Sequence, residues 1–457
     1  MKDRENIPIW SGKEVETVEK DVAKLVDFRD EGMPLDELSA LIEKYLEPHL
    51  IRYGHPGFHS LFNCFPEEGA HFGAKIALEY NQGVTNYQVS PGGVMTEVLC
   101  CRALCRLFGL GPEADATVMY CGTYANQQAL YLALHRKAEQ HGFNLSEKGL
   151  AGFPEPENLV VLASREAHFS LKHAVRIMGL GENSVVPLPV DKDLRLDIPR
   201  MRQAVKDLSG VKEVFCIVMT TGTTATGSVD PVQPVIDLCG QGDIWLHVDG
   251  AYGFAYRLVP EYSRLFDGTE FADSITWDPH KQFGVPIPSS VLFVRNKDDL
   301  YRMALYGDYF NRKEETAPNP GLKSPPSTRP FTALPIVTTI RYNGISGIIN
   351  KLRAPLEAIK ELADKLRHEP DIECRHTPDL GILCFQVVPE GFPRERLDRL
   401  QQYLFDRTQN EGKRSVSMTK LDGKTVLRIL VLSPEASADE LFITIDYLRA
   451  LARDFSL

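Results

Sequence analysis

No stretch of this chain of 457 residues approaches the roughly 20 consecutive apolar residues that a membrane-spanning helix needs. The first residues, Met1 to Asn6, are mostly charged or polar and no apolar segment follows them, so we expect no signal peptide. Basic side chains form no stripe, and a net charge of −11 argues against a nucleic-acid partner. These absences predict a cytoplasmic protein that binds neither a membrane nor a nucleic acid.

Paired cysteines are also missing. The chain has nine cysteines, and none stands in a Cys-x-x-Cys pair. Cys100, Cys101 and Cys105 cluster on a predicted helix, but metal sites usually draw on paired Cys or His spacings. The sequence therefore predicts no metal site, and we interpret these residues as buried, reduced thiols.

The chain exceeds the size of a single compact core, so we expect more than one structural unit. Residues 1–55 form an N-terminal helical segment, with helices expected at 15–28 and 35–45. Residues 56–335 form a large domain in which short apolar runs alternate with helical patterns. The predicted strands of this domain are 159–162, 214–219, 244–248, 274–277 and 291–294. Near-continuous apolar strands that alternate with helices predict an α/β fold, with a mostly parallel sheet covered on both faces.

Residues 311–330 are polar and rich in proline, which is typical of a long loop that acts as a lid or as a linker. Because few apolar residues anchor this loop, we expect it to be mobile. Residues 336–457 form a smaller α+β domain at the C-terminus. Its predicted elements are helices at 336–368, 394–409 and 438–454 and strands at 383–388 and 425–431.

Two charged residues follow apolar runs in the middle of the chain. The segment from Trp277 reads Trp-Asp-Pro-His-Lys-Gln-Phe, and it places Lys281 just past one predicted strand. The segment from His247 reads His-Val-Asp-Gly-Ala-Tyr, and it places Asp249 at the end of an earlier strand. A lysine that forms a Schiff base and a carboxylate that pairs with a protonated pyridine nitrogen are what pyridoxal 5'-phosphate (PLP) requires. Each residue alone also has an ordinary explanation, as a surface lysine and as an aspartate that caps the next turn.

Three more polar segments follow predicted strands. Gly122 and Thr123 open a helical pattern, where backbone N–H groups and the helix dipole can bind a phosphate, although Thr123 can also simply cap the helix. The segment from Thr220 to Gly227 places hydroxyls at a strand end, where open α/β sheets bind ligands, or it is only a threonine-rich turn. His168 can stack its imidazole on an aromatic cofactor ring, or it can be a histidine that starts a helix.

Taken in this order, the segments resemble the group II PLP-dependent decarboxylases, the family of glutamate and aromatic amino acid decarboxylases. The resemblance runs from about His55 to the C-terminus. The matching segments are His55-Pro56, Tyr87 with Ser90-Pro91, Gly122 to Asn126, His168, Thr220 to Thr224, His247 to Asp249, Asp278 to Lys281, and Leu427 to Ile429 with Ser433-Pro434. The Asp-Pro-His-Lys motif preceded by His-Val-Asp is the most specific of them.

The resemblance implies a fold-type I PLP enzyme, in which Lys281 forms the Schiff base and later moves protons. It also implies that Asp249 pairs with the ring nitrogen and that His168 stacks on the ring. The other cofactor-binding residues that it implies are Gly122, Thr123, Asn126, Thr220, Ala251, Asp278 and His280. Tyr87 and Arg428 would contact the substrate, because a planar guanidinium suits a carboxylate. The family further implies a homodimer with the active site at the subunit interface.

The chain departs from the family at three places. Glutamate decarboxylases of the family carry Asn-Gln shortly after the His-Pro pair, where this chain has Ser60 and Leu61, which argues against glutamate as the substrate. The family's mobile loop usually carries a tyrosine that protonates the carbanion, but residues 311–330 contain none. Tyr309 is the nearest candidate, and Tyr306 is another. Gly250 replaces an alanine of the family, a change that we interpret as widening the space around the ring.

The sequence therefore predicts a PLP-dependent decarboxylase that converts a small L-amino acid into the amine and CO2. The alternative is a PLP enzyme of the same fold with a diverted outcome, either oxidative decarboxylation-deamination to an aldehyde or another carbon–carbon lyase reaction. A third hypothesis, a non-catalytic protein that kept the fold for interactions, would need none of Lys281, Asp249 and His168.

Overall fold

The computed structural model describes residues 7–307, 311–313 and 316–455. Contacts within the chain divide it into two compact units. The large unit is Pro66–Arg353, and the small unit combines Met1–Phe65 with Ala354–Leu457. The division of the chain into segments 1–55, 56–335 and 336–457 stays a prediction. Among the described residues, no helix combines the length and the apolar composition needed to cross a membrane.

A seven-stranded sheet forms the centre of the large unit, in the order β2-β8-β7-β6-β5-β3-β4. The strands are β2 (Asp115–Met119), β3 (Leu159–Ser164), β4 (Val185–Leu188), β5 (Glu213–Thr220), β6 (Trp245–Asp249), β7 (Ser274–Trp277) and β8 (Ser290–Val294). Every pair is parallel except the two pairs that β8 makes with β2 and β7. The predicted α/β fold with a mostly parallel sheet is confirmed, and each of the five predicted strands is present.

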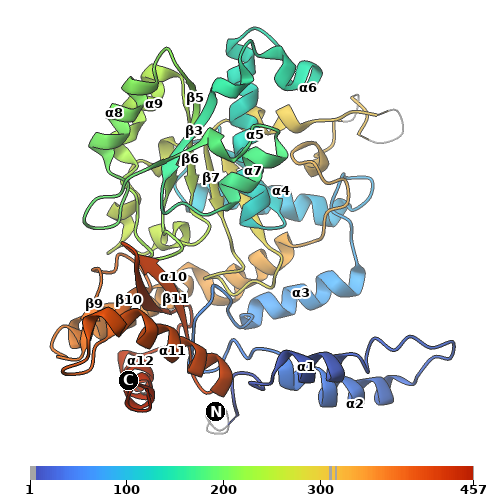
Figure 1. The fold of residues 1–457 in the computed structure, drawn as a ribbon. Coiled ribbons are helices and arrows are strands. Elements are labelled where there is room, and N and C mark those ends of the chain that lie inside the picture. The colour runs from blue at the N-terminus through green and yellow to red at the C-terminus, as the bar shows by residue number, and fades with distance from the viewer. Residues whose placement is uncertain (1–6, 308–310, 314–315, 456–457) are drawn as a thin grey trace. The chain divides into compact units, whose positions relative to one another are not determined.

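Helices cover both faces of this sheet, which explains why its strands are apolar almost throughout. Figure 1 shows α5 and α7 on one face, with α8 and α9 on the other. The helices of the large unit are α3 (Glu68–Tyr80), α4 (Pro91–Leu107), α5 (Gly122–Gln140), α6 (Leu145–Lys148), α7 (Ser170–Ile177), α8 (Ile198–Leu208) and α9 (Ile236–Gly242). Helix α10 (Ala333–Leu366) continues into the small unit, and it is interrupted at Gly344, whose φ of 66° glycine adopts without strain.

The three clustered cysteines lie on α4 and are buried. Burial raises the pKa of the Cys100 and Cys105 thiols to about 12. Because the thiolate is the reactive form of cysteine, these side chains act as small apolar groups of the core.

The small unit contains a five-stranded sheet in the order β1-β11-β12-β10-β9. Its strands are β1 (Phe58–His59), β9 (Ile372–Cys374), β10 (Ile382–Val387), β11 (Ser415–Leu421) and β12 (Lys424–Leu430), and α11 (Leu397–Glu411) and α12 (Ala438–Arg453) pack on them. The predicted α+β character is confirmed. No local pattern predicts that β1 pairs in parallel with the distant β11, with Phe58 in register with Ser415.

Two short helices of the small unit lie near the N-terminus. Helix α2 (Leu35–Tyr45) matches its prediction, but α1 (Val15–Val22) ends earlier than the predicted residue 28. Neither helix buries any residue within the chain. Their apolar side chains are exposed, with 74% exposure for Val15 and 83% for Leu35. An amphipathic helix with an uncovered apolar side is typical of a surface that a partner covers.

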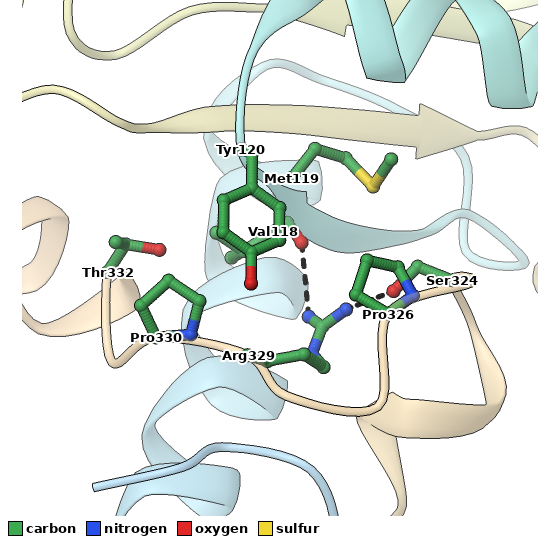
Figure 2. Close-up of a pocket in the computed structure, with 8 residues that line it drawn as sticks. All are labelled: Val118, Met119, Tyr120, Ser324, Pro326, Arg329, Pro330 and Thr332. Carbon is green, nitrogen blue, oxygen red and sulfur yellow. Dashed lines mark hydrogen bonds between the residues drawn. The ribbon is translucent and has the colours of Figure 1, made fainter.

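The second half of the proline-rich loop is held firmly against β2 and α4. The buried guanidinium of Arg329 pairs with the buried carboxylate of Glu97, and it donates to the carbonyl oxygen of Val118 at 3.1 Å. Figure 2 shows the guanidinium of Arg329 bonded to the carbonyl oxygen of Val118 and to Ser324. A second buried pair joins Lys323 to Asp115 on β2.

Backbone contacts add to these ion pairs. The hydroxyl of Tyr120 donates to the carbonyl oxygen of Thr328 at 2.6 Å, and the backbone N–H of Val84 donates to the carbonyl oxygen of Arg329 at 2.8 Å. Moving this part of the loop would separate buried charges, which is costly in a protein interior. The expected mobility of the loop is therefore wrong for residues 319–330.

We expect Arg329→Met to lower the free energy of unfolding by about 3–5 kcal/mol, because it leaves the Glu97 carboxylate buried without its partner. The double variant Arg329→Met with Glu97→Gln should recover most of that loss, since no unpaired charge remains. Lys297→Met, which breaks an exposed pair with Glu113, is the matched control and should leave stability unchanged. Urea unfolding of the four proteins checks the prediction, and equal midpoints for Arg329→Met and Lys297→Met would contradict it.

Candidate active site

The carboxyl ends of three neighbouring parallel strands bring several polar residues together. In the sheet register Thr220 of β5 lies beside Asp249 of β6, and Asp249 lies beside Thr276 of β7. Residues in register on parallel strands direct their side chains to the same face of a sheet. The three side chains therefore face the side of the sheet that α5 covers, at the edge where open α/β sheets bind ligands.

Lys281 lies in a turn directly after β7. Its backbone N–H donates to the carbonyl oxygen of Asp278 at 3.0 Å, and its Nζ lies 3.2 Å from Oδ2 of the same residue. The Lys281 side chain is 18% exposed. The neighbouring His280 donates from Nδ1 to the carbonyl oxygen of Ser289, and burial lowers its pKa. The turn thus presents a lysine amine beside a carboxylate in a place that retains access from outside.

The carboxylate of Asp249 is 5% exposed and receives two hydrogen bonds. Nδ2 of Asn126 donates to Oδ2 at 2.8 Å, and the backbone N–H of Ala251 donates to Oδ1 at 3.2 Å. The second bond is the turn cap considered from the sequence, and the first is additional. Both donors fix the orientation of the carboxylate, which suits a partner for a protonated ring nitrogen.

Helix α5 begins beside Asp278. Its N-cap residue is Cys121, and among the described residues no side chain caps its first N–H groups. Thr123 lies inside the first turn, so the interpretation of Thr123 as the N-cap is wrong. A Cβ added to Gly122 would lie 2.8 and 3.0 Å from the two carboxylate oxygens of Asp278. Only glycine fits here, and the N–H groups of this turn remain available for an anion.

His168 lies between β3 and α7. Its Nδ1 accepts the backbone N–H of Ser170 at 3.2 Å, as expected for a histidine that starts a helix. Burial has the largest effect on the pKa of His168 and lowers it. The carboxylates of Asp249 and Asp278 raise this pKa, and Lys281 lowers it further. The imidazole is therefore a neutral, flat ring within electrostatic reach of both Asp249 and Lys281.

The end of β5 is fixed by a buried carboxyl group that the sequence analysis did not single out. Oδ2 of Asp230 accepts the backbone N–H of Thr220 at 2.8 Å, and the N–H of Asp230 donates to the carbonyl oxygen of Thr220 at 3.0 Å. Burial raises the pKa of Asp230 to about 7, although the N–H groups of Thr220 and Leu196 lower it. Asp230 thus positions Thr220, whose Oγ1 has no partner within the described residues.

The raised pKa of Asp230 predicts a pH-dependent stability. Between about pH 4 and pH 7 the folded protein keeps this proton while the unfolded chain has lost it, so the contribution of Asp230 to the free energy of unfolding falls by up to about 1.4 kcal/mol per pH unit as pH rises. The contribution is fully present below the unfolded pKa and is lost on reaching the folded pKa. Urea unfolding between about pH 5 and pH 7 should give the wild type a less favourable pH slope than Asp230→Asn by this amount, because the buried histidines that titrate in the same range contribute equally to both proteins. Parallel slopes for the two proteins would contradict it.

The residues around Lys281 fit PLP. Lys281 can bind the cofactor aldehyde, Asp249 can pair with the ring nitrogen, and the uncapped start of α5 at Gly122 can hold the phosphate. The buried Oγ1 of Thr220 and Oδ1 of Asp278 both lack a hydrogen-bond partner within the described residues. Buried polar atoms without partners mark a place where a polar ligand completes the structure.

The contacts above do not include four other predicted residues. Arg428 belongs to the small unit, where it is buried, donates to Oγ of Ser417 at 2.7 Å and lies over the ring of Phe62. Tyr87 lies in the turn before α4 and is 43% exposed. Tyr309 lies outside the described residues, and Tyr306 is 48% exposed. The roles of these residues stay predictions.

Gly250 has a reason of its own in the packing. A Cβ at this position would lie 2.6 Å from Cβ of Phe254 and 3.0 Å from both Oγ1 of Thr221 and the carbonyl oxygen of Thr276. The missing methyl group would thus point into the chain itself. The interpretation of Gly250 as a widening of the ring site is wrong, and close packing between the strand ends explains the glycine.

The chain is similar to proteins of known activity. Residues 20–388 match the model of the pyridoxal-dependent decarboxylase conserved domain. The chain is 27% identical over 433 residues to an L-2,4-diaminobutyrate decarboxylase of Acinetobacter baumannii, covering 92% of this chain and 85% of the relative. It is 25% identical over 454 residues to an aromatic-L-amino-acid decarboxylase of Bacillus atrophaeus, covering 97% and 91% of the two chains.

Solved structures agree. The crystal structure of the glutamate decarboxylase domain of a diaminobutyrate-pyruvate transaminase and L-2,4-diaminobutyrate decarboxylase from Vibrio parahaemolyticus superimposes with a TM-score of 0.88. It is 25% identical, and the match covers 98% of this chain and 91% of that one. The resemblance seen in the sequence is thereby confirmed, and the chain belongs to the pyridoxal-dependent decarboxylase family as a PLP-dependent amino acid decarboxylase.

Proposed function

We propose that this protein removes the carboxylate of a small L-amino acid and releases the amine and CO2. The observation that carries the proposal is the grouping of Lys281, Asp249 and His168 at one edge of the sheet, with the uncapped start of α5 beside them. A protein that used the fold only for interactions would need neither a partly exposed lysine next to a carboxylate nor a buried aspartate held by two donors.

The residues of the site divide the work. PLP, when bound, draws off the electron pair that the departing CO2 leaves on Cα of the substrate. Asp249 holds its negative charge against the ring nitrogen, because Asn126 and Ala251 donate to it. His168 presents a neutral imidazole that would stack on the flat face of the cofactor ring. Lys281 would hold the cofactor, and its amine, once free, would carry a proton to or from Cα.

The bond that breaks is selected by how the substrate is held. A carboxylate held perpendicular to the cofactor ring is the group that leaves, so a fixed cation for that carboxylate would set the outcome. Arg428 is our candidate, since its guanidinium is anchored by Ser417 and by the carbonyl oxygen of Ser60. Tyr87 is a further candidate for substrate contact.

The side chains at positions 60 and 61 support a substrate other than glutamate. Ser60 is buried and its Oγ lies 3.1 Å from Oγ of Ser415, whereas Leu61 is 44% exposed. Neither offers the amide donor that a distal carboxylate needs, which argues against glutamate. The similarity to two L-2,4-diaminobutyrate decarboxylases supports a small amino acid, and that substrate should be tested first.

One observation favours the diverted outcome as a second candidate. Residues 311–330 contain no tyrosine to protonate Cα after CO2 has left. If Tyr309 and Tyr306 do not supply the proton, the carbanion persists and reacts otherwise. Oxidative decarboxylation-deamination, with O2 as the oxidant and water as the second reactant, would then give an aldehyde, CO2, ammonia and hydrogen peroxide. A carbon–carbon lyase reaction is the other alternative.

A product screen tests these proposals. The purified protein loaded with PLP is mixed with one amino acid at a time, and CO2, amine, aldehyde and peroxide are measured together. Equal amounts of CO2 and amine support simple decarboxylation. Aldehyde with peroxide supports the diverted outcome. Absence of any product across diamino, aromatic, acidic and small neutral amino acids would overturn the proposal.

We further propose a cytoplasmic homodimer whose active site lies at the subunit interface. The uncovered apolar sides of α1 and α2 support a second copy as the partner, since exposed apolar groups gain most from mutual burial. Sedimentation should give twice the mass of the chain. Val15→Lys with Leu35→Lys should shift it toward the monomer, whereas an unchanged mass would place the interface elsewhere.

A further inference from the structure

A continuous row of buried side chains lies behind Asp249 in the large unit. Asn126 on α5, His247 on β6, Ser274 on β7 and Trp245 on β6 are each at most 1% exposed. Oδ1 of Asn126 lies 3.1 Å from Nε2 of His247, and Oγ of Ser274 lies 2.8 Å from both Nδ1 of His247 and Nε1 of Trp245. Together with the bond from Asn126 to Asp249, these contacts form a row of four hydrogen bonds that ends on the carboxylate.

The direction of every bond follows from the two ends of the row. An ionised carboxylate only accepts, so Asn126 must turn its Nδ2 to Asp249 and its Oδ1 to His247. His247 must then donate from Nε2. Trp245 only donates, so Oγ of Ser274 accepts from it and gives its own proton to Nδ1 of His247. When the imidazole is neutral, this arrangement satisfies every donor and acceptor of the row.

The ionisation of His247 agrees with this arrangement. Burial lowers its pKa to about 4, although Asp249 and a hydrogen bond with the backbone of Ser274 raise it. The ring is therefore neutral at physiological pH, with one N–H and one acceptor nitrogen. That is what a group between an amide oxygen and a hydroxyl donor requires.

Asn126 has no freedom left in this setting. Its second Nδ2 hydrogen goes to Oγ of Ser170 at 2.9 Å. The opposite orientation of the amide would place its oxygen 2.8 Å from the carboxylate oxygen of Asp249, where two acceptors repel each other. Without a donor at His247, the amide oxygen would instead be buried with no partner, which is costly in a protein interior.

We propose that His247 is a positioning residue, which with Ser274 and Trp245 locks the amide of Asn126 so that Nδ2 holds the Asp249 carboxylate toward the ring nitrogen of the cofactor. Each group in the row donates toward Asp249, so the dipoles add and the negative charge is stabilised at one defined place. His247 thus acts on the reaction through Asn126, without touching the substrate. The inference rests on the role proposed for Asp249.

The first test needs no cofactor. Selective 15N-histidine labelling of the protein without PLP should show a neutral His247 ring that carries its proton on Nε2 across the neutral pH range, with the signal assigned by its absence from His247→Gln. A ring protonated on Nδ1 would overturn the proposed direction of the row. This result stands whether or not Asp249 proves important for turnover.

The second test compares variants loaded with PLP, once the substrate is known. We expect His247→Leu to lower kcat by about 10–100-fold with little change in KM, the usual cost of losing a group that orients a ligand-binding residue. His247→Gln can donate to Asn126 and accept from Ser274, so it should stay within about five-fold of the wild type. A folded His247→Leu protein within two-fold of the wild type would overturn the proposal.

Two controls separate the possible failures. His135→Leu removes a different buried, neutral histidine and should leave kcat unchanged. His135 lies on α5, about 13 Å along the helix from Asn126. If Asp249→Asn is fully active, the role of Asp249 fails. If Asp249→Asn is inactive but folded His247→Leu keeps its activity, the role of Asp249 stands and the positioning role proposed for His247 is wrong. If His247→Leu does not fold, Ser274→Ala takes its place, and a kcat within two-fold of the wild type then overturns the proposal.

Discussion

Lys281→Ala should abolish turnover and leave the cofactor without a covalent bond to the chain. The amine of Lys281 is the group beside Asp278 at the sheet edge that can bind the cofactor aldehyde, and alanine offers no replacement. We expect the rate to fall by at least about 10³-fold, since both the covalent bond and a proton carrier are lost. Borohydride reduction followed by peptide mapping checks the attachment, and kcat checks the rate.

Two controls make this result specific. Lys281→Arg keeps the positive charge beside Asp278 but cannot form the covalent bond, so it should be as inactive as alanine while retaining more of the stability. Lys172→Ala on α7 removes an exposed lysine and should change nothing. A pyridoxyl group found on a different lysine in the wild type would refute the assignment.

The fold of the large unit could be predicted because its signals are local. The runs 159–162 and 274–277 are apolar almost throughout and bounded by polar turns, which identifies strands that helices cover on both faces. The motif residues Asp249 and Lys281 could be placed for the same reason, as each follows such a run directly. Resemblance to a family then gave these residues roles that periodicity alone does not.

Contacts between distant segments were missed because no local pattern marks them. Strand β1 has two residues and pairs with Ser415 and Val416 far along the chain. The polar composition of residues 319–330 suggested mobility. The charged side chain of Arg329, however, pairs with the buried carboxylate of Glu97 and anchors this segment. Composition reports which groups are charged and not where their partners lie. Composition likewise does not reveal the partners of Asp230, whose carboxyl group accepts the backbone N–H groups of Thr220 and Leu196.

The supporting hydrogen bonds of the site were also out of reach. His247 was visible in the motif, but its contacts with Asn126 and Ser274 depend on the register of β6 and β7 and on the placement of α5. A pairing of His247 with Ser274 across neighbouring strands follows only when the register is known.

Asp249→Asn should still bind PLP but lose about 10³-fold in kcat, which corresponds to about 4 kcal/mol of barrier. The amide has nearly the same shape, yet it carries no charge to hold a proton on the ring nitrogen. It also offers one acceptor oxygen to the two donors, Asn126 and Ala251, so one of them loses its bond. The kcat of the variant and its cofactor affinity, measured separately, check the prediction. A loss of only a few-fold, about 1 kcal/mol or less, would contradict the role of Asp249.

The double variant Asn126→Asp with Asp249→Asn distinguishes the charge from the hydrogen bonds. Asn at position 249 can donate to Asp at position 126 and accept from Ala251, while Asp at position 126 can accept from His247 and Ser170, so every bond of the network can be made. The negative charge, however, has moved from the side chain at position 249 to the side chain at position 126, which is further from the ring nitrogen. If the charge at position 249 is what matters, the double variant stays as inactive as Asp249→Asn. Recovery of activity would mean that the cofactor needs an ordered network at this edge of the sheet and not a carboxylate at Asp249.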